Sequence, residues 1–345
     1  MSRIAVVLFN LGGPDSPRAI RPFLRNLFAD PAIVGAPTPL RLPLAEMISR
    51  TRLKLAKANY GAIGGASPLG RETEAQAAAL AVRLASLRPG DETRVFVAMR
   101  YWRPFAEETA RAVAAFAPDD IVLTPLYPQY STTTTESSLG AWAKAYRGPG
   151  RPHTICCYFD DERLAAAHAS LIRQAWEAAG SPAGVRLLFS AHGLPERISA
   201  SGDPYRWQVE QTCAKVAARL GPAWDWRICY QSRVGPLRWI GPSTTEEIEA
   251  AAAEGFGVVI DPIAFVSEHV ETLVELDRDY AAFAARVGAD PYIRVPTLRD
   301  DAAFIESLAQ LVNKALAESE AGVRPGAGHC AAGLARCALR TKAAA

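Results

Sequence analysis

Short runs of apolar, β-branched residues alternate along the chain with longer segments that carry alanine and leucine at helical spacing. The apolar runs predict strands at 4–9, 94–99, 120–124, 186–190, 225–230 and 257–260. The segments between them predict helices at 72–87, 106–116, 164–179, 203–220 and 244–253. Such alternation is typical of βα units, so we expect an α/β fold with mostly parallel, doubly wound sheets.

The two halves of the chain resemble each other where their predicted strands end. LFNLGGP at 8–14 matches LFSAHGLP at 188–195, and His192 stands where the first half has a glycine. IVLTPLYPQYSTTTTES at 121–137 matches VVIDPIAFVSEHVETL at 258–273. These matches keep their order, which predicts two related α/β halves facing one cleft. The alternative is that any two strand–turn segments look alike.

The length of 345 residues indicates about two domains. Glycine and proline at 148–152 place a boundary there, because such residues are common in linkers. We therefore expect an N-terminal domain at 1–150, a C-terminal domain with the catalytic residues at 151–320, and a cysteine-containing extension at 321–345.

Composition and charge exclude several classes of protein. The 38 Lys and Arg residues nearly balance the 36 Asp and Glu residues, so no broad positive field would attract nucleic acid. No apolar run reaches the roughly 18 residues of a membrane-spanning helix, and the first residues predict a strand rather than a signal peptide. The six cysteines do not suggest a disulfide framework, which favours the reducing cytoplasm, and we expect Cys213 and Cys229 to be buried structural thiols.

The segment 28–47 departs from the regular alternation. It contains four prolines among isoleucine, valine and leucine residues. Because proline disrupts helices, we expect an apolar, proline-stiffened excursion rather than a regular helix. Two roles remain open for it: a loop that covers the core, or an apolar lip over a ligand cleft or against a membrane.

His192 follows an apolar strand and precedes Gly193 and Pro195, which predict a tight turn at the carboxyl end of that strand. Ligands of open α/β sheets bind at this end of the strands, and imidazole titrates near neutral pH. A single histidine is more often structural, so the spacing alone leaves both a structural and a functional role open.

A second candidate lies in an acidic segment. Ser267 is a suitable N-cap for a helix that continues through Leu276, and on that helix Glu268, Glu271 and Glu275 fall on one stripe. Like charges at these spacings repel each other. The stripe is therefore either a solvated acidic face or a path for protons or a divalent metal ion, since such ions prefer carboxylate oxygens.

Arginine and aromatic residues follow the predicted strand that ends at Met99. Arg100 and Arg103 have the geometry to clamp carboxylates, and Tyr101 and Trp102 can stack on a flat ligand. The signal is weak by itself, because tyrosine and tryptophan also pack at domain edges.

Seven segments together resemble the ordered motifs of the ferrochelatase family: LFNLGGP (8–14), GGASPL (64–69), MRYW (99–102), PLYPQYS (125–131), FSAHGLP (189–195), YQSRVGP (230–236) and FVSEHVETLVELD (265–277). The resemblance covers about residues 4–316. It implies a class II chelatase-like fold, in which two flavodoxin-like (Rossmann-like) parallel-sheet domains face a porphyrin cleft.

The same resemblance implies a lyase that inserts Fe²⁺, as substrate, into protoporphyrin IX to form protohaem in the last step of haem biosynthesis. Two alternatives are a chelatase for coproporphyrin III or another tetrapyrrole, and a non-enzymatic porphyrin or haem carrier. The implied partners are the porphyrin and ferrous iron, with peripheral membrane contact through 28–47 as a further option. Whether the chain is a monomer or a homodimer stays open.

Position by position, the resemblance assigns His192 and Glu271 to catalysis and metal contact, and extends a proton or metal path through Glu268, His269 and Glu275. It also implies porphyrin-binding residues, which are Leu11, Ser67, Met99, Arg100, Tyr101, Trp239 and Phe265. A neutral imidazole can accept pyrrole protons, and carboxylates can pass on protons or a hydrated cation. Which of His192 and Glu271 takes protons and which guides iron stays open.

Some members of the family carry a [2Fe–2S] cluster held by one internal cysteine and three cysteines of a C-terminal extension. In this chain Cys330 and Cys337 lie in such an extension, and Cys156 and Cys157 are adjacent internally. Four thiolates are the usual requirement, and two adjacent ligands would be strained. The resemblance thus implies a cluster on these cysteines, and the alternative is a tail with two incidental thiols.

Overall fold

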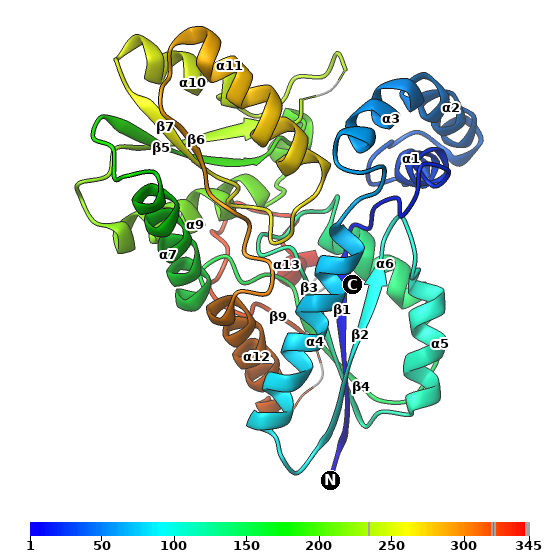
Figure 1. The fold of residues 1–345 in the computed structure, drawn as a ribbon. Helices are drawn as coiled ribbons and strands as arrows, with labels where there is room; N and C mark the ends of the chain where they lie inside the picture. The colour runs from blue at the N-terminus through cyan, green and yellow to red at the C-terminus, as the bar shows by residue number, and fades with distance from the viewer. Residues whose placement is uncertain (234, 319, 321, 342–345) are drawn as a thin grey trace. The chain divides into compact units, whose positions relative to one another are not determined.

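The computed structural model describes residues 1–233, 235–318, 320 and 322–341 (Figure 1). The chain forms two compact units, each built around a parallel sheet. The first unit contains Met1–Cys157 and Leu308–Gly326, and the second contains Tyr158–Ser307 and Ala327–Ala345. The expected α/β architecture with parallel sheets is confirmed.

The first unit has a five-stranded sheet in the order β2-β1-β3-β4-β9. Its strands are β1 (Arg3–Asn10), β2 (Glu92–Met99), β3 (Asp120–Pro125), β4 (Arg151–Ile155) and β9 (Gly322–Arg324). The side chains from Ile4 to Phe9 are all buried, which is why the central strand β1 appears in the sequence as one continuous apolar run.

The helices of the first unit connect and cover these strands. They are α1 (Ile20–Ala29), α2 (Thr38–Thr51), α3 (Leu53–Ala62), α4 (Leu69–Leu87), α5 (Ala106–Phe116) and α6 (Thr135–Ala145), while α12 (Ala302–Ala317) crosses from the second unit into the first. Val113 and Phe116 of α5 and Trp142 of α6 pack with Val7 and Phe9 on one face of the sheet.

The expectation of an irregular segment at 28–47 is wrong for its second half. Helix α2 begins at Thr38 and contains Pro43. Pro39 lies in the first turn, where the missing N–H would have no helical partner in any case. Pro43 is exposed, so the carbonyl group that loses its helical hydrogen bond can be solvated.

The second unit has a four-stranded sheet in the order β6-β5-β7-β8. Its strands are β5 (Val185–His192), β6 (Trp226–Gln231), β7 (Gly257–Asp261) and β8 (Tyr292–Arg294). Its remaining elements are α7 (Glu162–Ala178), α8 (Glu196–Ala200), α9 (Tyr205–Leu220), α10 (Thr244–Ala253), η1 (Glu271–Tyr280), α11 (Ala281–Val287) and α13 (Ala338–Thr341).

Alternate residues of β5 face two different layers of helices. Leu187 and Phe189 pack in the same cluster as residues of α7 and α9, and Leu188 packs with residues of α10 and α11. Figure 1 shows these helix pairs on opposite sides of the sheet. This three-layer arrangement leaves the carboxyl ends of β5 and β6 as the place where side chains can project beyond the core.

Most expected elements agree with the structure within two or three residues, and the helices at 106–116 and 244–253 match it at both ends. A capping box starts the second of these: the Ser243 hydroxyl accepts from the Glu246 N–H, and the Glu246 carboxylate accepts from the Ser243 N–H. The short strands β4, β8 and β9 were not expected.

The division of the chain differs from the boundary expected near residue 150 in two places. Residues 151–155 form β4, which pairs with β3 of the first unit. Residues 308–326 also belong to the first unit, where β9 pairs with β4. Because strand pairing adds both segments to the first sheet, the first unit consists of two separate parts of the chain.

Candidate active site

His192 is the last residue of β5, and its side chain is 40% exposed. Its Nδ1 lies 2.6 Å from the Gly193 carbonyl oxygen, which makes Nδ1 the donor of this hydrogen bond. Its Nε2 is thereby directed to Glu271, whose Oε1 lies 3.5 Å away. The Tyr205 hydroxyl donates to the His192 carbonyl at 3.1 Å and holds the backbone of the turn.

The turn after His192 requires glycine at position 193. A Cβ atom there would lie 2.8 Å from the Gln231 carbonyl oxygen and 3.2 Å from the Trp239 ring. The Gly193 N–H donates to that same Gln231 carbonyl at 2.8 Å. The close approach of β5 and β6 thus fixes the position of the histidine, and it places the half-buried Trp239 beside the turn.

Glu271 and Glu275 belong to η1, which is a π-helix. The expected α-helix with Ser267 as its N-cap is wrong, because residues 267–269 are irregular and the helical segment starts only at Val270. The i→i+5 hydrogen bonds of a π-helix widen each turn, so residues four apart lie more nearly above one another than in an α-helix. This geometry aligns the two carboxylates.

Three further side chains of the acidic segment have distinct surroundings. The Nε2 atom of His269 lies 3.9 Å from Glu271 Oε2. Phe265 packs edge-on against His269, with ring centroids 4.8 Å apart, and its ring centroid is 6.4 Å from that of His192. Glu275 accepts hydrogen bonds from Gln231 and Ser232. The structure therefore brings His192, Glu271, His269, Glu275 and Phe265 together.

Glu268 lies outside this group. Its carboxylate is 2.6 Å from Arg294 Nη1 and accepts from the Thr297 N–H at 3.0 Å. Burial alone would raise the pKa of Glu268, but Arg294 and these hydrogen bonds hold it below its usual value. The acidic stripe expected from the sequence is thus divided, because the charge of Glu268 is neutralised by an arginine that follows it by 26 residues.

The charges of the site are strongly coupled. Burial lowers the pKa of His192, but the charge and hydrogen bond of Glu271 outweigh burial and raise it to about 9. The same contact holds the pKa of Glu271 well below its usual range despite burial. In the free protein His192 is thus an imidazolium paired with a carboxylate at neutral pH, and not the neutral imidazole expected from the sequence.

The two neighbouring groups titrate differently. Burial lowers the pKa of His269, so this ring is neutral at pH 7. Burial and the nearby Glu271 charge raise the pKa of Glu275 to about 7. Among the residues that the structure describes, no three His, Cys, Asp or Glu side chains form a group that could hold a metal ion.

Two of the porphyrin-binding residues expected in the first unit, Arg100 and Tyr101, bind the same buried carboxylate. The Arg100 guanidinium lies 2.7 Å from the buried Asp30 carboxylate, which also accepts from the Tyr101 hydroxyl at 2.8 Å and from Ser137 at 2.5 Å. Tyr101 is fully buried, and Met99 is only 2% exposed. Arg100, which the sequence offered as a clamp for a ligand carboxylate, is thus already paired with Asp30.

A cavity of about 250 Å³ lies beside this network, and Met99, Arg100 and Asp30 line it together with Asn26 and Phe105. Asp30 was not among the residues expected from the sequence. Its signal was a carboxylate next to Pro31, followed by an apolar stretch at 32–37.

Leu11 and Ser67 follow strand and loop ends in the first unit. The Leu11 carbonyl accepts from the Tyr101 N–H, and the Ser67 N–H donates to the Pro14 carbonyl at 2.7 Å. A Cβ atom on Gly13 would lie 2.5 Å from the Ser67 side chain, so these segments are tightly packed. Both residues are half-buried and have side-chain surface available to a ligand.

The cysteines occur as two pairs and two isolated thiols, and all six are free. In the first unit the sulfur atoms of Cys156 and Cys157 are 3.6 Å apart. In the second unit a hydrogen bond with Cys330 lowers the pKa of Cys337 to about 6. The two pairs belong to different units, and a [2Fe–2S] cluster usually requires four thiolates.

The other two cysteines are buried in the second unit, as expected. Cys213 and Cys229 are each 0% exposed. Burial raises the pKa of both thiols, that of Cys229 to about 12, so they are inert core residues.

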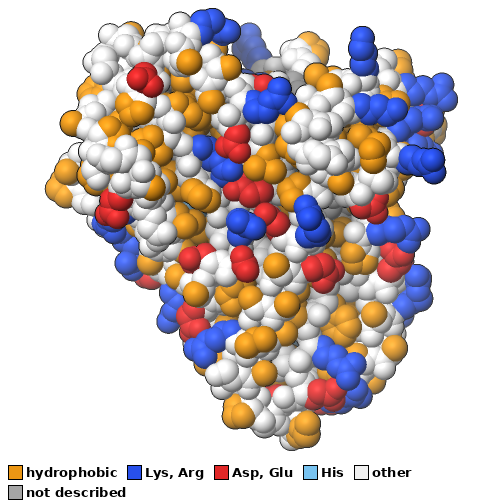
Figure 2. All heavy atoms as spheres, viewed as in Figure 1, with side chains coloured by type: hydrophobic (Ala, Val, Ile, Leu, Met, Phe, Trp, Pro, Cys, Tyr) orange, Lys and Arg blue, Asp and Glu red, His pale blue; other side chains and the backbone are white. Residues whose placement is uncertain are grey.

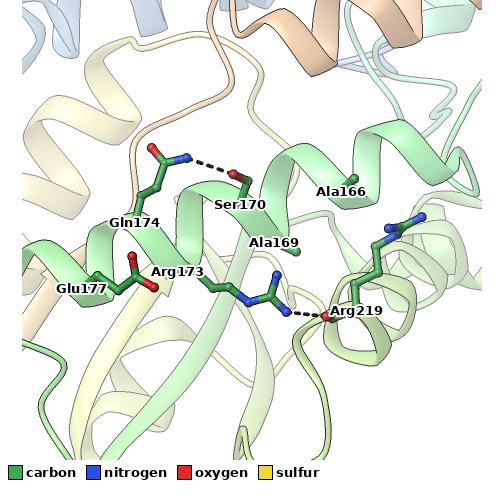
Figure 3. A pocket seen from close by; sticks show the side chains of 7 residues that line it. All are labelled: Ala166, Ala169, Ser170, Arg173, Gln174, Glu177 and Arg219. Carbon is green, nitrogen blue, oxygen red and sulfur yellow. Dashed lines mark hydrogen bonds between the residues drawn. The ribbon is translucent and has the colours of Figure 1, made fainter.

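A second cavity, of about 330 Å³, lies between α7 and α9 (Figure 3). Its two arginines have partners: Arg173 donates to the Arg219 carbonyl at 2.5 Å, and the Arg219 side chain binds Glu162. It contains no histidine or cysteine and none of the residues around His192. This groove is therefore not the candidate active site.

Known proteins resemble this chain over nearly its whole length. The sequence pattern of the ferrochelatase family matches residues 3–316. A ferrochelatase from Caulobacter vibrioides is 58% identical over 344 residues, which is 99% of each chain. A ferrochelatase from Phenylobacterium zucineum is 59% identical over 339 residues, or 98% of each chain.

Two solved structures resemble the fold. SirB from Bacillus subtilis, solved with Fe³⁺, has a TM-score of 0.53 and 12% identity over 92% of this chain and 97% of its own. DR2241 from Deinococcus radiodurans, described as structurally similar to chelatases, has a TM-score of 0.53 and 14% identity over 89% of this chain and 54% of its own. They confirm the chelatase-like α/β fold. The chain therefore belongs to the ferrochelatase family of lyases, which insert iron into a porphyrin in haem biosynthesis.

Proposed function

We propose that this ferrochelatase inserts Fe²⁺ into protoporphyrin IX and that His192 and Glu271 carry out the proton and metal transfers. The observation that supports this most is the pair itself. The partly exposed imidazole of His192 stands at the carboxyl end of β5, and the Glu271 carboxylate, at the start of η1, lies 3.5 Å from it. Ligands of open α/β sheets bind at this edge.

Insertion of the metal forms four iron–nitrogen bonds and releases two pyrrole protons, so the site must accept protons while it admits a cation. In the free protein the imidazolium of His192 is stabilised by Glu271. An incoming divalent cation repels that imidazolium and lowers its pKa, so His192 gives up its proton, which passes through Glu275 to water. The neutral imidazole then accepts the two pyrrole protons one after the other and passes each to water by the same path, and Glu271 offsets the positive charge that forms each time.

Glu275 and His269 are proposed to continue this path. The pKa of about 7 allows Glu275 both to accept and to release a proton near neutral pH. His269 stays neutral and so can accept a proton or contact a passing cation. For Glu268 we propose a structural role, because its carboxylate is neutralised by Arg294 and hydrogen-bonded to Thr297.

The porphyrin itself is a flat apolar ring with carboxylate side chains. Trp239 and Phe265 are proposed to contact it near His192, since aromatic faces pack on flat rings. In the first unit, the residues proposed to contact the ring are Leu11, Ser67, Met99, Arg100 and Tyr101. Tyr101 would act through the network that it forms with Asp30, because the ring of Tyr101 is fully buried.

The choice of porphyrin is tested by anaerobic mixing of the protein with Fe²⁺ and one free porphyrin at a time, followed by visible absorbance. Faster metallation of protoporphyrin IX supports the proposal. Faster metallation of coproporphyrin III, or of another tetrapyrrole, replaces it with the corresponding alternative. Binding of the porphyrin without catalytic turnover would support a carrier and contradict the proposal.

The [2Fe–2S] cluster stays a prediction, and no step of the reaction depends on it. It is supported by the paired thiols of Cys330 and Cys337 and by the lowered pKa of Cys337, because metals bind the thiolate. We expect anaerobically purified protein to be reddish-brown and to lose its visible absorbance in a Cys330→Ser variant. A Cys213→Ser control should keep the colour. Colourless wild-type protein with six titratable thiols would contradict the prediction.

Peripheral contact with anionic lipid is proposed for the surface of α2 and α3. Leu40, Met47 and Leu55 are at least 55% exposed there, and Lys and Arg side chains cover the same region (Figure 2). No helix in the described part of the chain is long and apolar enough to cross a bilayer.

We expect the protein to sediment with vesicles of anionic phospholipid, and a Leu40→Ser/Met47→Ser variant to sediment several-fold less. Val82→Ser alters an equally exposed apolar residue on α4 and serves as the control. Equal sedimentation of all three proteins would contradict membrane contact through this surface.

A cytoplasmic location is proposed from the cysteines. All six are free thiols, two of them paired closely in each unit, and such thiols persist in a reducing compartment.

A further inference from the structure

Gln231 and Ser232 stand at the end of β6, between the turn that carries His192 and the π-helix η1. Given the proposed roles of His192 and Glu271, on which this inference rests, we propose that Gln231 and Ser232 are positioning residues. They hold the Glu275 carboxylate and the first turn of η1 in the arrangement that proton transfer requires. Neither side chain needs to touch the porphyrin or the iron.

Gln231 connects three parts of the site through one buried residue. Its backbone carbonyl accepts from the Gly193 N–H at 2.8 Å, next to His192. Its side-chain Nε2 donates to the Glu271 carbonyl at 2.8 Å and to Glu275 Oε2 at 3.1 Å. Gln231 therefore ties the histidine turn to both carboxylate-bearing residues of η1.

The orientation of the Gln231 amide is set by a hydrogen bond to its oxygen atom. Its Oε1 accepts from the Ser190 hydroxyl at 2.9 Å, and this hydroxyl is also 3.1 Å from that of Thr244. With Oε1 bound to a donor, the NH₂ group must face η1. All of these atoms are buried, so water cannot readily replace the contacts.

Ser232 holds the same carboxylate oxygen from a strained backbone. Its hydroxyl donates to Glu275 Oε2 at 2.7 Å. Its φ of +61° lies in the left-handed region, which glycine adopts without strain and serine does not. What serine supplies here and glycine cannot is the hydroxyl bound to Glu275.

The Glu275 carboxylate needs the hydrogen-bond donors of Gln231 and Ser232 because Glu271 lies close to it. Glu271 and Glu275 lie four residues apart on η1 and carry like charges, which would drive the Glu275 side chain outward into solvent. Two donors on one oxygen keep Glu275 facing the site. Without them the side chain would sample other rotamers and break the path that begins at Glu271.

The decisive variant is Ser232→Gly, which removes the hydroxyl and also relieves the backbone strain. We expect kcat to fall about tenfold, as for the loss of one hydrogen bond to a charged group. The KM for porphyrin should change less than twofold, and the thermal midpoint should stay the same or rise. Ser232→Asn, which tolerates this φ and carries an N–H donor, should recover most of the lost kcat.

The matched control is Ser181→Gly. Ser181 also has a left-handed φ, of +53°, but it precedes β5 and so lies at the end of that strand opposite His192. Its kcat should equal that of the wild type. A second variant, Gln231→Met, keeps the length of the side chain but none of its hydrogen bonds, and should lower kcat more than Ser232→Gly.

A Ser232→Gly enzyme with wild-type kcat would overturn the inference. So would a KM that rises in proportion to the loss of kcat, a lowered thermal midpoint, or a Ser232→Asn enzyme as slow as Ser232→Gly. If the proposed function itself were wrong, the results would differ from these. The wild-type protein would then metallate no porphyrin, or His192→Ala would retain full activity.

Discussion

Replacement of His192 by alanine is expected to abolish porphyrin metallation while the protein still binds porphyrin. The imidazole is the group proposed to accept pyrrole protons, and loss of a general base lowers rates by about 10²–10⁴-fold. Aromatic and apolar contacts to the porphyrin would remain. The measurement is the anaerobic rate of metallation by visible absorbance, together with porphyrin affinity by quenching of protein fluorescence.

His329→Ala is a suitable control, because His329 is an exposed histidine of the C-terminal extension. It should metallate porphyrin at the wild-type rate. A folded His192→Ala protein with near-normal activity would remove His192 from the mechanism and support the structural interpretation of this residue.

The His192→Ala variant should also alter the pH dependence of stability. Pairing with Glu271 raises the pKa of His192 from 6.5 to about 9, so the pair stabilises the folded state fully below about pH 6.5. That stabilisation is lost as the pH rises through about 9. The difference in free energy of unfolding between wild type and variant should therefore be larger at pH 6 than at pH 9.5, as measured by urea denaturation.

Replacement of Glu271 by glutamine is expected to cause the second large loss of activity. Glutamine keeps the volume of the side chain but removes the charge that stabilises the imidazolium, so we expect kcat to fall about 10²-fold or more. The pKa of His192 should fall below its wild-type value of about 9, since the charge that most opposes burial is removed. Histidine NMR titration measures that change directly.

Two isosteric variants distinguish a proton path from an acidic surface. Glu275→Gln should lower kcat less than Glu271→Gln, because Glu275 lies one turn further along η1. Glu268→Gln should act mainly on stability, with a loss of about 3 kcal/mol, because it leaves the mostly buried Arg294 without a charged partner on that side. Small and equal effects of Glu271→Gln and Glu275→Gln on kcat would instead support a solvated acidic face.

The sequence predicted best those helices and strands whose pattern of buried residues lies entirely within one short segment of the chain. β1 and β5 are buried along most of their length, so both are centred on apolar runs, Ile4–Phe9 and Leu187–Phe189, that predict a strand. The helix that begins at Thr244 has its own capping box, formed by Ser243 and Glu246. These signals are local, and no distant residue is needed to interpret them.

The elements that the sequence missed depend on partners far along the chain. β9 has only three residues and exists because it pairs with β4, more than 160 residues earlier. The π-helical form of η1 is equally non-local. An α-helix and a π-helix fit the same spacing of glutamates, and Arg294 and Gln231 hold the start of η1 from other elements.

For the site, the sequence determined which chemical groups are present: a histidine in a tight glycine turn, an acidic segment, and an arginine–tyrosine pair after a strand. Only the tertiary structure decided their partners and charges. It paired Glu271 with His192, Glu268 with Arg294, and Asp30 with Arg100. The reason is physical: whether a side chain is buried and strand-forming is largely a local property, whereas its pKa depends on charges within a few ångströms that come from remote parts of the chain.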